Sequence, residues 1–226
     1  MNKISQMLKL QQELNDATNG LGWENGITKN NKIIDWRRCS YLECAELIES
    51  YPWKHWKNID AEPDYDNIKI EAVDIWHFIM SEALRVYKKD NLGDRESLTS
   101  MIENLPNFQQ FKQKHQADNK NHYEHIEVVE TLIRTLFVES RIDRLVEAFI
   151  NVAIQSALDL DSLYQLYIGK NILNQFRQEN GYKDGSYRKI WNGEEDNVIM
   201  QKILSQNPET SPQELYLKLQ EVYKKS

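Results

Sequence analysis

The sequence predicts an all-α fold, and three observations support this prediction. Apolar residues recur at helical spacing through most of the chain, as Tyr41, Cys44, Ala45 and Ile48 illustrate. The 226 residues include only 8 glycines and 5 prolines, so long irregular regions are not expected. No segment shows the alternation of apolar and polar residues that a half-buried strand requires. We therefore expect one helical domain over residues 1–226.

The same spacing locates the individual helices. Apolar periodicity predicts helices near residues 7–14, 41–48, 68–86 and 126–157, then up to about residue 176 and again after residue 211. Asp159 or Asp161 is the expected cap of the helix that ends near residue 176, and Ser211, Pro212 and Glu214 form a capping-box pattern. Residues 88–125 are polar and weakly patterned, with a break at Leu105–Pro106, and residues 180–187 read as a loop.

Composition and charge exclude several classes of function. The net charge of −7 is unlike that of a general nucleic-acid binder, which is normally basic. Cys39 and Cys44 are five residues apart and lie on different sides of a helix, so we expect no disulfide between them and a reducing compartment. The first residues lack the apolar segment of a secretion signal, and no apolar run approaches the length of a membrane span. We expect a soluble cytoplasmic protein.

Two pairs of acidic residues interrupt apolar helical stretches. Glu43 and Glu46 lie in "YLECAELIES", and Glu71 and Asp74 lie in "IEAVDIWHF". Positions i and i+3 are neighbours on a helix, so each pair directs two carboxylates to one place. Roughly five such pairs are expected by chance in a chain this acidic, and most of these lie on solvated faces. Here the flanking residues are apolar, where an ionised carboxylate is costly unless it is paired or binds a metal.

Two antiparallel helices that carry these pairs would bring four carboxylates together. Four like charges repel one another unless cations lie among them, and hard oxygen ligands suit Mg²⁺ or Mn²⁺. A divalent metal site is therefore one interpretation. A buried salt-bridge network with Arg37 or Arg38 is the other, and the spacing leaves both open.

Cations and amides in the C-terminal part form a complementary group. The stretch "YIGKNILNQFRQENGYKDGSYRK" places Asn171, Asn174 and Arg177 three residues apart, so these side chains share one helix face. Lys170 lies beside them. Arginine and lysine are the usual partners of phosphate, although a solvated basic face is the commoner explanation of such a cluster by itself.

Together these stretches resemble a known family. "ECAEL" followed by "EAVDIWHF" is similar to the ExxE…ExxD signature of the all-α nucleoside triphosphate pyrophosphatases, which include MazG-like proteins. The longer stretches "LKLQQELNDATNGLGWENG", "WRRCSYLECAELIESYPWKHWKN" and "YIGKNILNQFRQENGYKDGSYRKIWNGEEDN" resemble the dimeric all-α dUTPases of trypanosomatids, some phages and Campylobacter-like bacteria. The resemblance covers about residues 7–87 and 160–197, and residues 88–158 carry no matching motif.

The resemblance implies roles for individual residues. The metal ligands would be Glu43, Glu46, Glu71 and Asp74, holding two or more Mg²⁺ ions per site with Mn²⁺ as a substitute, and Glu46 is the expected acceptor of the proton from the attacking water. The uracil side would be formed by Gln12, Asn15, Trp53 or Trp56, His77 and Phe78. Contacts to phosphate and sugar would come from Lys170, Asn171, Asn174, Arg177, Tyr182 and Lys183.

The resemblance also implies an architecture and a reaction. The fold would be a helical bundle of the all-α NTP pyrophosphatase type, completed by the C-terminal helical motif, and the protein would be a homodimer. It would hydrolyse dUTP, and also dUDP, to dUMP with release of pyrophosphate or phosphate. This activity would limit uracil incorporation into DNA and supply dUMP for thymidylate synthesis.

Two alternatives stand beside this interpretation. The first is a MazG-like pyrophosphohydrolase of another nucleotide such as dCTP, which a substrate panel separates from a dUTPase. The second is a non-catalytic helical dimerisation module whose carboxylates form salt bridges only, and which would show no Mg²⁺-dependent turnover.

Overall fold

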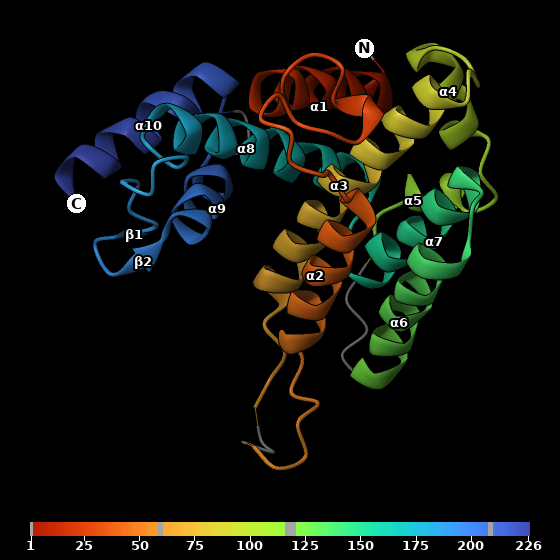
Figure 1. Cartoon of the computed structure of the whole chain (residues 1–226). Helices are drawn as coiled ribbons and strands as arrows, with labels where there is room; N and C mark the ends of the chain where they lie inside the picture. The colour runs from red at the N-terminus through yellow and green to blue at the C-terminus, as the bar shows by residue number, and fades with distance from the viewer. Residues whose placement is uncertain (1, 58–60, 116–120, 208–209) are drawn as a thin grey trace. The chain divides into compact units, whose positions relative to one another are not determined.

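The computed structural model describes residues 2–57, 61–115, 121–207 and 210–226, and within them nearly all regular structure is α-helix (Figure 1). This confirms the predicted all-α class. The chain divides into two compact units, Met1–Leu163 and Tyr164–Ser226. The expectation of a single domain over residues 1–226 stays a prediction. None of the helices in the described ranges combines the length and the apolarity that crossing a membrane requires.

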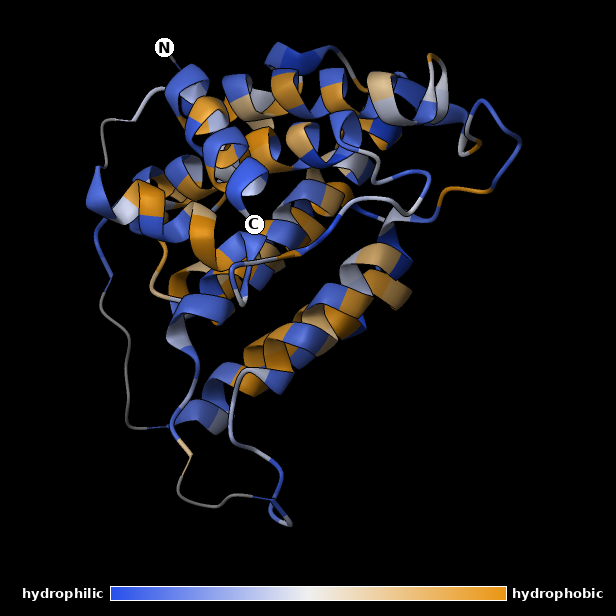
Figure 2. Cartoon of the chain, turned by 90° about the vertical axis from the view of Figure 1, so that its left-hand side faces the viewer, coloured by the Kyte–Doolittle hydropathy of each residue, from blue (hydrophilic) through white to orange (hydrophobic). Residues whose placement is uncertain are grey.

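The first unit is built around its longest helix, α3. Its elements are α1 (Lys3–Asn19), the 3-10 helix η1 (Trp23–Asn25), α2 (Trp36–Glu49), α3 (Tyr65–Lys89), α4 (Arg95–Glu103), α5 (Phe108–Phe111), α6 (His122–Val138) and α7 (Ile142–Gln155). Helix α3 packs along α2 and also contacts α1, α4, α7 and η1 (Figure 1). The helices carry hydrophobic stripes beside hydrophilic ones (Figure 2), as helices with one buried face do.

Local sequence determines where several of these helices begin. The caps of α1, α2, α3 and α4 each accept a hydrogen bond from the backbone amide three residues later, and they are Asn2, Asp35, Asp64 and Asp94. Such a cap satisfies an amide that has no partner within the helix. Asp159 accepts in the same way from the amide of Ser162, so Asp159 is the cap before α8.

Two described parts of the middle of the chain differ from what the sequence pattern indicated. Within the polar region 88–125, α4 and α5 form because Leu98 and Ile102, and then Phe108 and Phe111, bury a narrow apolar stripe. The predicted break at Leu105–Pro106 lies between these two helices. The long helical region expected over about residues 126–157 consists of two helices, because α6 ends at Val138 and α7 begins at Ile142.

The second unit has an aromatic core. The helix α8 (Leu160–Glu179) begins in the first unit and continues into the second, which also contains β1 (Ile190–Trp191), β2 (Glu194–Glu195), α9 (Asp196–Gln206) and α10 (Pro212–Lys225). Phe176 is fully buried, with its ring centroid 5.7 Å from that of Trp191 and 5.4 Å from that of Tyr223. The predicted capping box of Ser211 and Glu214 opens α10 and is confirmed.

The pair β1–β2 is a small exception to the expectation of no strands. Ile190 pairs with Glu195 and Trp191 with Glu194, across a turn in which Asn192 and Gly193 have φ angles of 52° and 87°. Positive φ at both turn positions favours the Asn-Gly sequence and matches the twist of a tight hairpin. Two-residue strands are too short for alternation to be detected.

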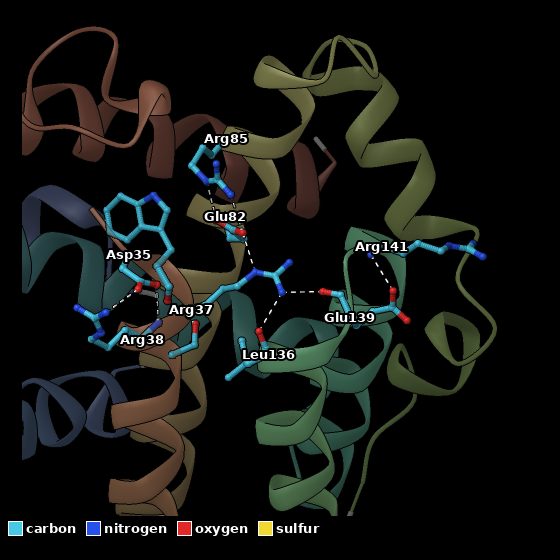
Figure 3. Close-up of polar contacts among 10 residues, drawn as sticks. Asp35, Arg37, Arg38, Glu82, Arg85, Leu136, Glu139 and Arg141 are labelled. Atoms are coloured by element: carbon cyan, nitrogen blue, oxygen red, sulfur yellow. Dashed lines mark hydrogen bonds and ion pairs between the residues drawn. The ribbon is translucent and has the colours of Figure 1, made fainter. Parts of the chain in front are cut away.

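A buried ion cluster joins three helices of the first unit (Figure 3). Glu82 of α3 is 3% exposed and accepts from Arg37 Nε of α2 at 2.9 Å and from Arg85 Nε at 2.8 Å. Arg37 Nη1 also donates to the carbonyl oxygens of Leu136 and Glu139 at the end of α6, at 2.9 and 2.6 Å. Burial alone would raise the pKa of Glu82, but its hydrogen bonds to the two guanidinium groups hold that pKa below its ordinary value.

We expect Glu82→Ala to lower the unfolding free energy by about 3 to 5 kcal/mol, because it leaves two partly buried arginines without their shared anion. Denaturant titration measures this loss. Glu221→Ala is the matched control, since Glu221 pairs with Lys225 on the exposed face of α10 and its removal should leave the transition midpoint almost unchanged. Equal effects of the two substitutions would contradict the structural role of Glu82.

Candidate functional site

The two predicted acidic pairs meet where α2 packs against α3. Glu43 and Glu46 of α2 and Glu71 of α3 each offer a carboxylate oxygen, and these three atoms all lie within 4.8 Å of one another. The charge of Asp74, one turn after Glu71, acts on Glu43 as well. The structure therefore brings three of the four predicted carboxylates together, with Asp74 near enough to act on Glu43, and these four residues are called the acidic cluster below.

The members of the acidic cluster differ in exposure. Glu71 is 7% exposed, Glu43 and Asp74 are half-buried, and Glu46 is exposed. Glu46 and Glu71 also line an open pocket of about 460 Å³, together with Tyr51 of the α2–α3 connection and Asn67 in the first turn of α3. The cluster thus extends from the helix interface to a surface that a ligand can reach.

The electrostatics of the acidic cluster raises the pKa of one of its carboxyl groups. Burial and the neighbouring charges of Asp74, Glu71 and Glu46 raise the pKa of Glu43 to about 8, and a hydrogen bond with the Glu71 carboxyl acts in the same direction. A proton is thus retained where like charges converge. Converging carboxylate oxygens with partial burial suit a hard divalent cation such as Mg²⁺ or Mn²⁺, so the residues present fit a metal of this kind.

Arg37 and Arg38 are engaged away from this cluster. Arg37 joins the Glu82 cluster described above, and Arg38 Nη2 pairs with Asp35 Oδ2 at 3.2 Å on the surface (Figure 3). Neither arginine therefore performs the neutralising role that the salt-bridge interpretation assigned to it.

A buried polar network lies one turn along α3 from the acidic cluster. Ser81 Oγ donates to the His77 carbonyl at 2.8 Å and accepts from Gln11 Nε2 at 3.0 Å and Asn15 Nδ2 at 2.9 Å. Because Gln11 donates through its nitrogen, its oxygen faces His77 Nδ1 at 2.7 Å, and His77 Nδ1 is the donor. The network fixes the orientation of His77, which is 4% exposed.

The other residues predicted for the uracil side have separate surroundings. Gln12 is half-buried, and its amide nitrogen donates to Asp16 at 2.9 Å and to Glu24 at 3.2 Å, whereas its neighbour Gln11 contacts His77. Phe78 is half-buried and stacks on Trp36 with ring centroids 6.0 Å apart. The rings of Trp53 and Trp56 lie edge to face at 5.7 Å, with Trp53 half-buried and Trp56 64% exposed.

Within the second unit, the predicted phosphate residues form a partly buried group. Arg177 is 8% exposed; its Nε and Nη2 form a fork on Asp196 at 2.9 and 2.7 Å, and its Nη1 donates to Asn174 Oδ1 at 3.2 Å. Lys170 is 2% exposed and donates to Asn197 Oδ1 at 3.0 Å.

The remaining predicted residues of this unit lie around that group. The exposed ring of Tyr182 lies 5.9 Å from Arg177 Cζ. Asn171 donates to the Tyr167 hydroxyl at 3.4 Å. Lys183 is exposed on the turn after α8.

Sequence reasoning missed four polar residues of these two groups: Gln11, Ser81, Asp196 and Asn197. For Gln11 a signal was present, because Gln11 and Asn15 are four residues apart on one face of α1, as His77 and Ser81 are on α3. For Asp196 and Asn197 no spacing rule applies, because their cationic partners lie 19 to 27 residues earlier in the chain.

The described elements are almost all helices, and a carboxylate cluster lies between two of them. These two features define the class: an all-α protein whose candidate site suits a divalent cation. Residues 3–182 match the dUTPase family, and the chain belongs to that family. Family membership makes it a hydrolase of dUTP, with a nucleotide as its substrate, and indicates a divalent metal requirement in general. No curated protein matches this chain.

The raised pKa of Glu43 predicts that the stability of the metal-free protein depends on pH. A carboxyl whose pKa rises on folding from 4.5 to about 8 stabilises the fold below pH 4.5 and loses that contribution as the pH rises to about 8. In EDTA, the melting temperature of Glu43→Gln should fall less over this window than that of the unchanged protein. Glu13→Gln, on the exposed face of α1, should retain the full fall. Identical slopes in all three proteins would contradict the cluster electrostatics.

Proposed function

We propose that the chain hydrolyses dUTP, and also dUDP, in a Mg²⁺-dependent reaction that yields dUMP with release of pyrophosphate or phosphate. The observation that carries this proposal is the convergence of Glu43, Glu46 and Glu71 in a chain of the dUTPase family. Its biological consequences would be less uracil in DNA and a supply of dUMP for thymidylate synthesis. A cytoplasmic location agrees with the two free cysteines.

The acidic cluster is the proposed metal site, with Glu43, Glu46, Glu71 and Asp74 as ligands. Bound Mg²⁺, at two or more ions or with Mn²⁺ in its place, would lower the pKa of water and neutralise phosphate charge. The buried Glu71 and half-buried Glu43 are suited to hold fixed positions, because the packing of α2 against α3 restricts them.

Glu46 is the proposed general base. It belongs to the cluster, yet it is exposed and lines the open pocket, where water and substrate can approach it. A base in this position removes a proton from the attacking water while the neighbouring carboxylates stay in place.

Selectivity for uracil is assigned to the residues near His77. Asn15 and His77 belong to one hydrogen-bonded network, so their polar atoms are held in fixed directions and can distinguish uracil from cytosine at its hydrogen-bonding edge. Phe78, held against Trp36, can exclude the methyl group of thymine. Gln12 and Trp53 remain proposed contacts on the basis of the family pattern, and Trp56 is the alternative to Trp53.

The phosphate chain and sugar are assigned to the second unit. The proposed contacts are Lys170, Asn171, Asn174, Arg177, Tyr182 and Lys183. The closeness of Lys170, Asn174, Arg177 and Tyr182 within this unit supports the assignment, because clustered cations stabilise a leaving pyrophosphate.

The test of this function is phosphate release from dUTP and dUDP with Mg²⁺, with EDTA as control and with dCTP and dTTP as competing substrates. Turnover that requires Mg²⁺ and favours the uracil nucleotides is expected. Equal turnover of dCTP would contradict uracil selectivity, and full activity in EDTA would contradict the metal site.

Glu46→Gln isolates the role of the exposed carboxylate within this test. It keeps the size of the side chain and removes the anion, so kcat should fall by about 10² or more. Stability without metal should hold or rise, because one repelling charge is gone. Glu130→Gln is the control, since Glu130 is exposed on α6 and does not line the open pocket, and it should keep kcat. A destabilised Glu46→Gln with normal turnover would contradict the assignment.

We also propose that the protein is a homodimer. Apolar side chains of α2 and α6 are exposed in the single chain, among them Leu42 at 52%, Phe137 at 64% and Val138 at 83%. Exposed apolar groups of this size at neighbouring helices favour association. Light scattering at micromolar concentration should give about twice 26.8 kDa, and Phe137→Glu with Val138→Glu should shift the mass toward the monomer. An active monomer in the unchanged protein would contradict this.

A further inference from the structure

The cations of α8 are held by residues at the start of α9, which follow the matched segment 3–182 and lie at the end of the stretch that resembles the all-α dUTPases. That match ends at residue 182, whereas the partners of Lys170 and Arg177 are Asp196 and Asn197 at the start of α9. Each of these contacts lies within the second unit.

Asp196 is a fully engaged buried carboxylate. It is 1% exposed, accepts the fork from Arg177, and accepts a hydrogen bond from the Tyr187 hydroxyl at 2.7 Å. Burial alone would raise its pKa, but the hydrogen bonds and charge of Arg177 hold the pKa below its ordinary value. Its position in the first turn of α9 also places the anion at the positive end of the helix dipole.

Asn197 connects the two cations. Its Oδ1 atom accepts from Lys170 Nζ at 3.0 Å and from Arg177 Nη2 at 3.2 Å. Lysine and arginine side chains lose considerable rotamer freedom when they are fixed in this way. Cations fixed before the substrate arrives require no reorganisation when negative charge develops in the reaction.

The same group anchors the turn that follows α8. The Tyr187 hydroxyl on Asp196 fixes one end of the turn, and the Tyr182 ring lies 5.9 Å from both Arg177 Cζ and Lys189 Nζ. Gly181, at a φ of 92°, sits where a side chain would collide with Ser186. The turn that carries Tyr182 and Lys183 is therefore held in place by its contacts with the Arg177–Asp196 pair.

We propose that Asp196 and Asn197 are positioning residues for the phosphate chain of the nucleotide: they fix Lys170, Arg177 and the 181–189 turn in the arrangement that receives phosphate. This inference rests on the proposed function, in which those residues contact the phosphates. It differs from a purely structural role, in which the Arg177–Asp196 pair would stabilise the unit without affecting any ligand.

The experiment measures inhibition of dUTP turnover by two probes, inorganic pyrophosphate and free uracil, at fixed free Mg²⁺ and well below each melting temperature. Asp196→Asn and Asn197→Ala should each raise the inhibition constant of pyrophosphate about tenfold, as expected for weakened charge-assisted contacts. The inhibition constant of uracil should change by less than about twofold, because the base is assigned to residues of the first unit and makes no contact with the phosphate and sugar residues. Unchanged constants for both probes, or equal rises in both, would overturn the inference.

Two further variants make the outcome specific. Glu82→Gln weakens the buried ion cluster of the first unit and should lower the melting temperature while leaving both inhibition constants unchanged. Lys183→Ala tests the proposed phosphate role directly. If Lys183→Ala raises the inhibition constant of pyrophosphate and the Asp196 and Asn197 variants do not, the positioning inference fails and the proposed function stands. If Lys183→Ala and both positioning variants leave pyrophosphate inhibition unchanged, the proposed phosphate role of this segment and the inference fail together.

Discussion

Repulsion among the carboxylates between α2 and α3 is the constraint on which the first unit depends. Glu43, Glu46 and Glu71 converge within 4.8 Å, so the two helices would separate at this point if nothing else held them. The buried face of α3 and the Arg37–Glu82 pair beyond the acidic cluster hold them together. Because Arg37 also binds the end of α6, the same interaction ties a third helix to the pair. Packing and ion pairing elsewhere in the unit thus offset the unfavourable repulsion among these carboxylates.

The graded exposure of the acidic cluster separates two tasks that a metal site must perform. A ligand that is fixed by packing, such as Glu71, holds position but is shielded from water. An exposed carboxylate such as Glu46 meets water but is less restrained. A proton on Glu43 and a bound cation would each offset the same excess of negative charge. Cation binding would therefore be linked to proton release at the proposed site. On the proposal that a divalent cation binds here, its affinity is expected to rise with pH through the range in which Glu43 titrates.

The sequence allowed the fold class and the acidic cluster to be predicted, because both arise from spacing along single helices. Glu43 with Glu46 and Glu71 with Asp74 are i, i+3 pairs, and their meeting needs only that two neighbouring helices pack antiparallel. The Arg177–Asp196 pair could not be predicted in this way, since the hairpin between α8 and α9 decides whether these residues meet. The break between α6 and α7 was missed because Val138 and Ile142 continue the apolar pattern across it, while the contact of Arg37 at that break comes from α2. Gln12 was chosen from the family resemblance and not from the periodicity of α1, so it stays a prediction beside the observed contact of Gln11 with His77.

The carboxylates of this chain fall into two kinds that residue type alone does not distinguish. Glu82 and Asp196 are both almost fully buried, and arginine donors hold the pKa of each below its ordinary value. Glu43 is less buried, yet burial and the charges of its acidic neighbours act in the same direction and raise its pKa. A carboxylate that its own protein has neutralised contributes to structure and to the placement of other groups. A carboxylate that lies among like charges can be neutralised by a bound cation, and groups of this kind are concentrated at functional sites. This contrast, more than burial or charge taken separately, is why the acidic cluster is assigned to metal binding and the Asp196 pair to positioning.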